Sequence, residues 1–349
     1  MREIAKSLRS TCWLLMATFI ASAAFAQAPS STLLVLAKSD NTVAIVDPAT
    51  LQVLARIPAG PDPHEIIASV DGKLAYISNY GGSDSTLNTI SVVDLVARKA
   101  LPAIDLGALR STHGLDFAGG KLYFTAETNK VIGRYDPATQ RVDWVLGTGQ
   151  DRTHMIAVSK SLDRIVTSNV NSATISIIEQ VSPPSGGFSP PGGPRLTWEV
   201  TNIPAGRGAE GFDISPDGKE IWAANARDAT VTIIDVATRK PTQTLPIPVK
   251  GANRLKFTPD GKHVLISGLG ARNGDSSLVV LDGATHGEVK QLNLGGGAAG
   301  ILIAPDSSRA YVAVSTADKI DVIDLKTLEV VGHIDAGKQP DGLAWAVRQ

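Results

Sequence analysis

Three histidines and one glutamate are the residues of this sequence best suited to bind a metal ion. His64, His113 and His154 each stand near the start of an apolar segment, and they are half of the chain's six histidines. Glu210 holds the same place before the next such segment. Imidazole nitrogens joined by a carboxylate or a water suit zinc, copper, iron or nickel. The sequence therefore predicts a divalent metal site, with a merely solvated polar surface as the alternative.

A metal ion at this place would support hydrolysis. It would lower the pKa of a bound water and polarise a carbonyl group, which is the chemistry needed to cleave an ester or a lactone. Other catalytic motifs are absent from the sequence: there is no G-x-S-x-G nucleophile elbow and no P-loop. Residues 295–300 match G-x-G-x-x-G, but they lead into a strand pattern rather than a helix, so they lack the dinucleotide-binding context.

Arginines near the same segment starts indicate recognition of an anion. Arg152 and Arg254 flank two of these starts, and guanidinium groups bind carboxylate or phosphate in a bidentate manner. The alternatives are ordinary surface arginines, and asparagines that only serve turn geometry. The further polar residues that we expect to bind a ligand or to lie beside it are Asn253, Asp341, Asn169, Asn225, Tyr80 and Glu127.

The elements that would position these residues form a repeat. An alternating apolar segment that ends in an acidic residue, followed by a turn, occurs seven times at intervals of 42 to 56 residues. Alternation with a period of two predicts β-strands. The acidic residues that end the seven copies are Asp47, Asp94, Asp136, Glu179, Asp235, Asp282 and Asp324.

A second repeated phrase, Ser-x-Asp-Gly-Lys, predicts a tight turn in the same units. It occurs at residues 69–73 and 215–219, with a near copy at 258–262. Asp-Gly between alternating strands marks a hairpin because glycine accepts a positive φ. Each unit then holds four short strands in about 45 residues, the period of a propeller blade. The sequence therefore predicts an all-β fold, a seven-bladed β-propeller of four-stranded antiparallel blades.

The first and last segments are expected to close the ring. Residues 32–57 supply three strands of a blade, and residues 341–346 supply the missing one. Their pairing would leave no open sheet edge between blades, so we expect a monomer. The predicted metal ligands, Asn253 and Asp341 then stand where successive blades begin, at one mouth of the central channel. We expect this face to bind a small molecule or a protein.

The repeat resembles a known family. Three copies of a strand end lie at residues 75–79, 165–169 and 221–225, two of them preceded by Asp-Gly-Lys and followed by a strand that ends in the Ile-Asp pattern. These copies resemble the YVTN-repeat β-propeller family, and the resemblance covers nearly all of the chain beyond residue 26. The family is mostly secreted or on the cell surface, and it is similar to the propellers of cytochrome d1 and of lactonase-type proteins. The resemblance leaves three functions open: a binding protein, a metal-dependent lactonase-like or esterase-like hydrolase, and a redox protein with a bound metal cofactor.

The N-terminal segment predicts export. Three basic residues precede an apolar run that is too short to span a bilayer, and Ala24-Phe25-Ala26 is a cleavage signature. We expect a signal peptide at residues 1–26, one propeller domain at residues 27–349, and a periplasmic or secreted protein. The proline- and glycine-rich residues 181–197 are expected to form a loop inserted between two strands of one blade.

Composition excludes several further classes. Lysine and arginine number 33 against 34 acidic residues, a net charge of −1, so no nucleic-acid partner is expected. The only cysteine, Cys12, lies in the predicted signal peptide, which excludes thiol catalysis and covalent haem attachment in the exported chain. No segment after the signal peptide is long and apolar enough to predict a membrane span.

Overall fold

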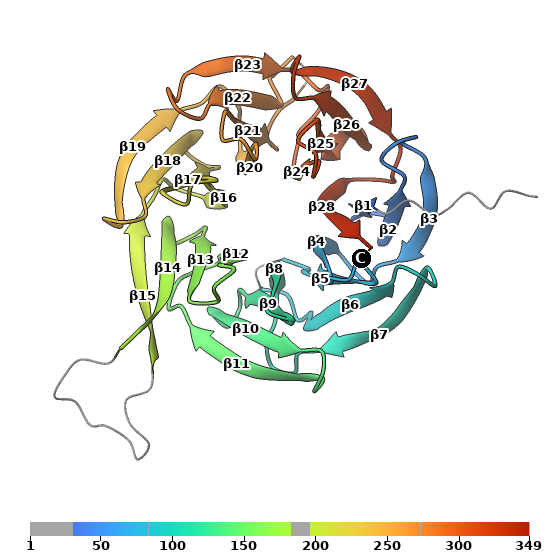
Figure 1. Ribbon diagram of the computed structural model, residues 1–349, viewed down its shortest axis with the longest axis vertical. Coiled ribbons are helices and arrows are strands. Elements are labelled where there is room, and N and C mark those ends of the chain that lie inside the picture. The colour runs from blue at the N-terminus through green and yellow to red at the C-terminus, as the bar shows by residue number, and fades with distance from the viewer. Residues whose placement is uncertain (1–30, 83, 183–195, 273, 349) are drawn as a thin grey trace, which may run out of the picture.

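The computed structural model describes residues 31–82, 84–182, 196–272 and 274–348. Within these residues the chain forms seven four-stranded antiparallel sheets arranged as the blades of a ring (Figure 1). The predicted seven-bladed β-propeller is therefore confirmed. We number the blades 1 to 7 from the one that contains β1, and the innermost strand of each blade faces the central channel.

Within each blade the strands follow one another from the channel outward. Blade 1 comprises β28 (Pro340–Val347), β1 (Ser31–Ala37), β2 (Thr42–Val46) and β3 (Val53–Pro58). Blade 2 comprises β4 (Pro63–Ala68), β5 (Leu74–Asn79), β6 (Thr89–Asp94) and β7 (Lys99–Asp105). Blade 3 comprises β8 (Thr112–Ala118), β9 (Lys121–Ala126), β10 (Val131–Asp136) and β11 (Arg141–Gly147), and blade 4 comprises β12 (Thr153–Val158), β13 (Arg164–Asn169), β14 (Thr174–Val181) and β15 (Thr197–Pro204). Blade 5 comprises β16 (Ala209–Ile214), β17 (Glu220–Asn225), β18 (Thr230–Asp235) and β19 (Lys240–Pro246). Blade 6 comprises β20 (Ala252–Phe257), β21 (His263–Gly268), β22 (Leu278–Asp282) and β23 (Glu288–Leu292). Blade 7 comprises β24 (Ile301–Ile303), β25 (Arg309–Val314), β26 (Lys319–Asp324) and β27 (Glu329–Ile334), with a short 3₁₀ turn, η1 (Ser315–Ala317), before β26.

The two repeated phrases form the turns that the sequence predicts. In the Ser-x-Asp-Gly-Lys turn, Asp71 Oδ1 accepts hydrogen bonds from Ser69 Oγ at 2.6 Å and Lys73 N at 3.1 Å. Gly72 has a φ of 65°, which only glycine adopts without strain. At the end of β2, Asp47 accepts from the Ala49 amide at 2.9 Å. Aspartate therefore ends a strand at this turn because its carboxylate satisfies the amides that follow.

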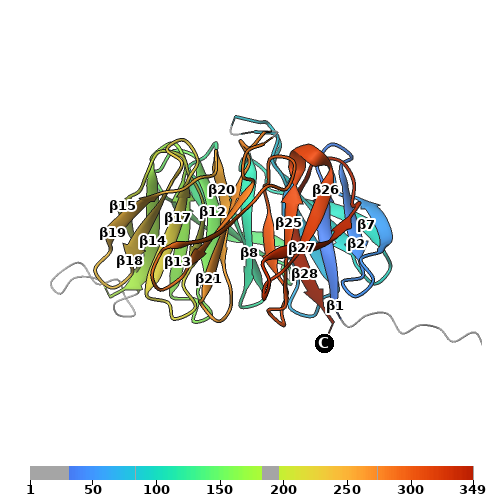
Figure 2. The ribbon, with the colours of Figure 1, turned by 90° about the horizontal axis from the view of Figure 1, so that it is seen from above.

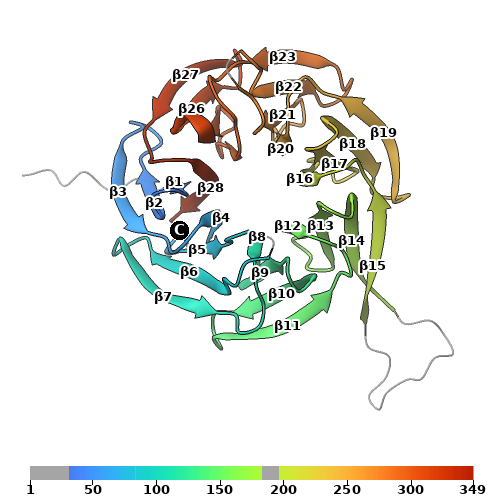
Figure 3. The same ribbon diagram turned by 180° about the vertical axis from the view of Figure 1, so that it is seen from behind.

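The ring closes between the two ends of the chain. β1 pairs with β28 from Ser31↔Val347 to Ala37↔Pro340, so blade 1 combines three N-terminal strands with the last strand of the chain. Figure 3 shows β28 and β1 side by side from the opposite side of the ring. The predicted closure by residues 32–57 and 341–346 is confirmed, and it gives β1 a hydrogen-bonded partner on each side, β28 and β2.

The core lies between neighbouring blades. Leu36 and Ile45 of blade 1, for example, pack with Ile77 and Val93 of blade 2. Figure 2 shows the blades edge-on, with the strands of each sheet standing side by side around the axis. Because every blade buries both faces of its second and third strands, these strands are mostly apolar.

Hydroxyl groups also link neighbouring blades close to the channel. Thr125 Oγ1 accepts from Gly114 N at 2.9 Å and donates to the carbonyl oxygen of His154 in the next blade at 2.9 Å. The link holds the innermost strands β8 and β12 together at the level of the histidines. Two more junctions carry the same donation, from Ser168 Oγ to Glu210 O at 2.6 Å and from Ser267 Oγ to Ala299 O at 2.6 Å.

Two predicted segments lie wholly or mostly outside the described residues. The predicted signal peptide, residues 1–26, is one of them, and most of the loop at residues 181–197 is the other. That loop joins β14 to β15, the third and fourth strands of blade 4, as the spacing of the repeats predicts. Among the residues that the structure describes, no helix is long and apolar enough to cross a membrane.

Candidate functional site

Six of the predicted site residues occupy equivalent places around the channel. Each is the second residue of an innermost strand, close to the end where that strand enters its blade. Pro63, the first residue of β4, pairs with Asn79, the last residue of β5, so the loops that follow each second strand lie on the same face. We call this face the mouth. The six residues are His64 (β4), His113 (β8), His154 (β12), Glu210 (β16), Asn253 (β20) and Asp341 (β28).

A β-bulge lies at this position in the innermost strands. In β4 the pairing with β5 shifts between Pro63 and Ile66, so His64 and Glu65 both lie in the bulge. The same shift occurs in β8, β12, β16 and β20. A bulge redirects side chains away from strict alternation. Two adjacent residues of one strand can therefore both contribute to the mouth.

The three histidines lie against one another. The ring centroids of His64 and His113 are 5.3 Å apart, and those of His113 and His154 are 3.6 Å apart. Tyr80, in the loop after β5, places its ring 4.8 Å from the ring of His64 and 4.7 Å from that of His113. Three neighbouring blades thus form one aromatic cluster, in which His113 and His154 are buried and His64 is partly exposed.

His154 is bracketed by two carboxylates. Its Nδ1 lies 2.5 Å from Glu127 Oε1, and its Nε2 lies 3.0 Å from Glu210 Oε1, although this second contact lacks the alignment of a hydrogen bond. Burial alone would lower the pKa of His154, but the Glu210 charge and the contact with Glu127 outweigh it, so the pKa is raised. Burial would likewise raise the pKa of Glu210, yet His154 and Arg152 hold it at about 2. Both pKa shifts favour the charged forms of the pair, an imidazolium beside a carboxylate.

His113 differs from His154 in the direction of its pKa shift and in the partner of its Nδ1. Burial, reinforced by the nearby charges of His154 and His64, holds the pKa of His113 well below its usual value. Its Nδ1 is buried and finds no hydrogen-bond partner among the described residues. A buried polar atom without a partner costs roughly 1–3 kcal/mol, so it points to a missing water or ligand.

Arg152 lies beside the same carboxylates without forming close hydrogen bonds to them. Its Nε is 3.5 Å from Glu127 Oε2, and its Nη2 is 3.6 Å from Glu210 Oε1. Glu127 Oε2 instead accepts from the Tyr80 hydroxyl at 2.7 Å. The buried Nε of Arg152 is without a hydrogen-bond partner among the described residues. About a quarter of the Arg152 side chain is exposed, so this guanidinium is open to an incoming group.

Arg254 bridges the channel. Its Nη2 donates to Glu65 Oε1 at 2.5 Å, which joins blade 6 to blade 2. Its Nη1 lies 3.3 Å from Asn253 Oδ1. Both side chains of the bridge are largely buried. Asp341 has its own partner, Lys38 Nζ at 2.9 Å. Arg254 and Asp341 therefore each have a close partner within the mouth, whereas the contacts of Arg152 with carboxylates are longer, at 3.5 and 3.6 Å.

Asn169 and Asn225 lie at the mouth end of their strands, but their side chains are buried inside the blades. Both are fully buried at the ends of β13 and β17. Asn169 Nδ2 donates to Ser176 Oγ at 2.8 Å, and Asn225 Nδ2 donates to Thr232 Oγ1 at 2.9 Å. Neither has a positive φ, so the alternative that they serve left-handed turn geometry is wrong. They join the second and third strands inside a blade, and we leave them out of the proposed site.

The arrangement does not fit the predicted metal site as it stands. No group of three or more histidine, cysteine, aspartate or glutamate side chains within the described ranges is placed to hold a metal ion. Both nitrogens of His154 face carboxylates, and a protonated imidazole cannot ligate a metal. The metal site on His64, His113, His154 and Glu210 therefore stays a prediction. A measurement of the metal content of the protein, described below, tests it.

The site contains residues whose importance the sequence does not reveal. Glu65 and Lys38 supply the partners of Arg254 and Asp341, but neither belongs to a repeated motif. The one signal in the sequence for Glu65 is its place directly after His64, and that signal has meaning only once the bulge is known. Tyr80 and Glu127 were expected on this face, and the structure places both of them against the histidines.

The comparisons with known proteins bear on the fold. No family model matches the chain, and no curated protein matches its sequence. The resemblance to the YVTN-repeat family therefore stays a prediction.

Solved structures with low sequence identity share the architecture. A functionally unknown protein from Desulfotomaculum acetoxidans has a TM-score of 0.69 at 13% identity, covering 88% of this chain and 98% of that one. The dihydro-heme d1 dehydrogenase NirN in complex with DHE has a TM-score of 0.62 at 16% identity, covering 92% and 76%. A candidate 6-phosphogluconolactonase from Bacteroides uniformis has a TM-score of 0.66 at 14% identity, covering 90% and 99%. The chain is thus a seven-bladed β-propeller similar in fold to lactonase-like and d1-type propellers, and its function has to be argued from the mouth.

Proposed function

We propose that this protein binds a small molecule carrying a carboxylate or phosphate group at the mouth of its channel. The observation that carries the proposal is the pair of buried nitrogens without a hydrogen-bond partner, Arg152 Nε and His113 Nδ1; Arg152 has only the longer contacts of 3.5 and 3.6 Å to Glu127 and Glu210. An arginine nitrogen can only donate a hydrogen bond. A ligand that completes the cluster must therefore offer an acceptor to Arg152.

The layout of the mouth supports an anion rather than a neutral acceptor. His64 and Arg152 are the more accessible side chains, while His113, His154 and Glu127 lie beneath them. The charge of Arg152 favours an anionic acceptor at this entry, and the carboxylates of Glu127 and Glu210, 3.5 and 3.6 Å from its nitrogens, offset part of that charge. Hydrogen bonds to charged partners contribute about 1.5–3 kcal/mol, roughly twice as much as neutral ones.

Replacing Arg152 with methionine is expected to weaken anion binding by about tenfold to a hundredfold, because the charged donors are lost while the aliphatic stem remains. The measurement is isothermal titration of the full mature chain with dicarboxylates and sugar phosphates. Arg207 is the matched control. It also precedes an innermost strand, but about three quarters of its side chain is exposed and it pairs with Asp228 at 2.7 Å. Arg207→Met should leave the affinity unchanged.

Two outcomes would contradict the proposal. One is equal affinity for each anion and its neutral amide or alcohol analogue. The other is an Arg152→Met protein that folds normally and binds the anions as the unaltered chain does. Either result would mean that the guanidinium does not meet the ligand.

The second candidate is the metal-dependent hydrolase, supported by the adjacency of three imidazoles. This candidate predicts bound metal after incubation with zinc, copper, iron or nickel salts, and elemental analysis checks it. Less than about a tenth of an equivalent in the unaltered chain would contradict the metal site. About one equivalent that disappears in His113→Ala would support it. Turnover of lactones or esters that depends on this metal would then favour the hydrolase, and reversible oxidation of the bound metal would favour the redox protein.

A further inference from the structure

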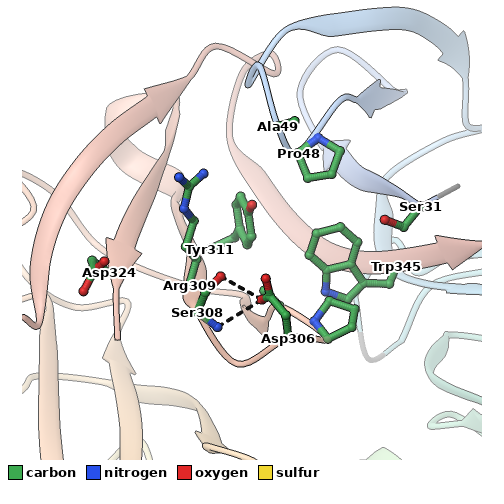
Figure 4. A pocket seen from close by; sticks show the side chains of 11 residues that line it. Ser31, Pro48, Ala49, Asp306, Ser308, Arg309, Tyr311, Asp324 and Trp345 are labelled. Atoms are coloured by element: carbon green, nitrogen blue, oxygen red, sulfur yellow. Dashed lines mark hydrogen bonds between the residues drawn. The ribbon is translucent and has the colours of Figure 1, made fainter. Parts of the chain in front are cut away.

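A cleft opens on the face opposite the mouth, where the ring closes. It lies between blade 7 and blade 1 and has a volume of about 620 Å³, within the range of small-molecule sites. Its walls come from the turn after β24, the turn after β2, and the last strand β28. Figure 4 shows Trp345 and Pro48 on one side of the cleft, with Arg309 and Tyr311 across from them.

One wall is a fixed aromatic platform. The indole Nε1 of Trp345 donates to the carbonyl oxygen of Ile303 at 2.9 Å, which sets the plane of the ring. The ring of Tyr311 meets Trp345 edge-on, with 5.5 Å between centroids. Tyr311 is buried and supports the partly exposed indole of Trp345, so a ligand that stacks on Trp345 need not order its ring first.

The other walls carry ionised groups with defined directions. Asp306 Oδ1 accepts from Ser308 N at 3.0 Å and Ser308 Oγ at 2.7 Å. Asp324 Oδ1 accepts from the amides of Lys326 at 2.9 Å and Thr327 at 2.8 Å. Arg309 also lines the cleft, where it interacts with the Tyr311 hydroxyl and attracts the carboxylate of Asp306. The cleft thus offers carboxylate acceptors of fixed orientation and an arginine donor beside the ring of Trp345.

The same junction elsewhere in the ring serves as an internal comparison. Between blades 2 and 3 a cleft of about 510 Å³ has Tyr76 and Pro137 in the places of Tyr311 and Pro48, but its other walls are mostly aliphatic. Between blades 5 and 6, Trp222 is fully buried against Phe257 and His286. A cleft at a blade junction is therefore a product of the repeat. Arginines and carboxylates also line the cleft between blades 4 and 5, where Arg164 and Arg239 both pair with Glu179. The closure cleft differs in having the partly exposed indole of Trp345 beside Arg309.

We propose that the closure cleft binds a neutral sugar. A pyranose has an apolar face of C–H groups that packs on an aromatic ring, and a rim of hydroxyls that both donate and accept hydrogen bonds. Carboxylates accept from neighbouring hydroxyls, and an arginine fork donates to hydroxyl or ring oxygens. This site is separate from the mouth and does not depend on the anion proposed there.

The test is titration of the full mature chain with glucose, galactose, mannose, N-acetylglucosamine and their disaccharides, followed by saturation-transfer NMR and calorimetry. At least one sugar is expected to bind saturably. Arg309→Met, a surface change outside the core, should weaken that binding by about tenfold or more. Gln140→Met, at the corresponding cleft between blades 2 and 3, is the matched control and should have no effect.

The outcomes separate this proposal from its rivals and from the mouth. Trp345→Leu should abolish sugar binding while anion binding at the mouth continues, which shows that the ring is still closed. Arg152→Met should leave sugar binding intact. Saturable binding of spermidine but of no sugar would overturn the proposal in favour of a cation site. Sugar affinity that is unchanged in Arg309→Met, or no sugar binding at all, would also overturn it.

Discussion

A chain that ends at residue 339 should fail to fold as a stable monomer. It lacks β28, which pairs along the whole of β1 and completes blade 1. Without it, the edge of β1 is exposed, although residues Leu33, Leu34, Val35, Leu36 and Ala37 are fully buried in the intact ring. An apolar unpaired edge leads to aggregation. Typical folding free energies of about 5–15 kcal/mol are too small to absorb the loss of a whole core strand.

Thermal unfolding followed by circular dichroism, with size-exclusion chromatography, measures the effect. We expect aggregates or a chain without a cooperative transition. Removal of residues 348–349 alone is the control, because they lie beyond the end of β28 and should not change the unfolding temperature. A peptide of residues 340–349 added to the truncated chain should restore the transition. A truncated chain that unfolds like the intact one would show that the closure is dispensable.

The second large effect concerns the bridge across the channel. Arg254→Met leaves the largely buried carboxylate of Glu65 without its partner, and Glu65→Gln leaves the buried guanidinium without its counter-charge. Breaking one side of a buried ion pair typically costs about 3–5 kcal/mol. Replacing both members is far milder, since no isolated charge remains. We therefore expect each single variant to be less stable than the double variant.

Urea unfolding of the four proteins of this cycle provides the free energies. The exposed pair Lys130–Asp151, whose atoms are 3.7 Å apart, is the matched control, and Lys130→Met should change stability by less than about 1 kcal/mol. If the single variants at Glu65 and Arg254 are as stable as the intact chain, the bridge does not hold blades 2 and 6 together in solution.

The sequence predicts the fold closely because the fold is local and repeated. Each strand end and turn is encoded by its own residues: Asp71 and Gly72 in one turn, Asp47 in another. Once the period is known, the place of every blade follows, and so does the shared position of His64, His113 and His154. Even the closure can be predicted, because the first unit lacks one strand and the last unit supplies it.

The pairing of the site residues could not be predicted in the same way. Spacing places His154 at the mouth, but its contacts come from Glu127 in a loop and from Glu210 in another blade. Whether an imidazole meets a metal or a carboxylate depends on where its nitrogens lie to within a few ångströms. The bulges set those positions because they redirect the side chains. The partners Glu65 and Arg254 lie on opposite sides of the channel, and no local pattern relates them.

Hydrogen bonds from side chain to backbone join neighbouring blades at several junctions of the ring. Thr125, Ser168 and Ser267 join blades 3 to 4, 4 to 5 and 6 to 7. Where an alanine replaces the hydroxyl, in blades 5 and 7, other side chains make the link: Asp213 accepts from the Phe257 amide at 2.9 Å, and Trp345 donates to the Ile303 carbonyl oxygen at 2.9 Å. The blades therefore set the spacing of the innermost strands, and a ligand at the mouth meets side chains that the sheets, rather than the loops, hold in place.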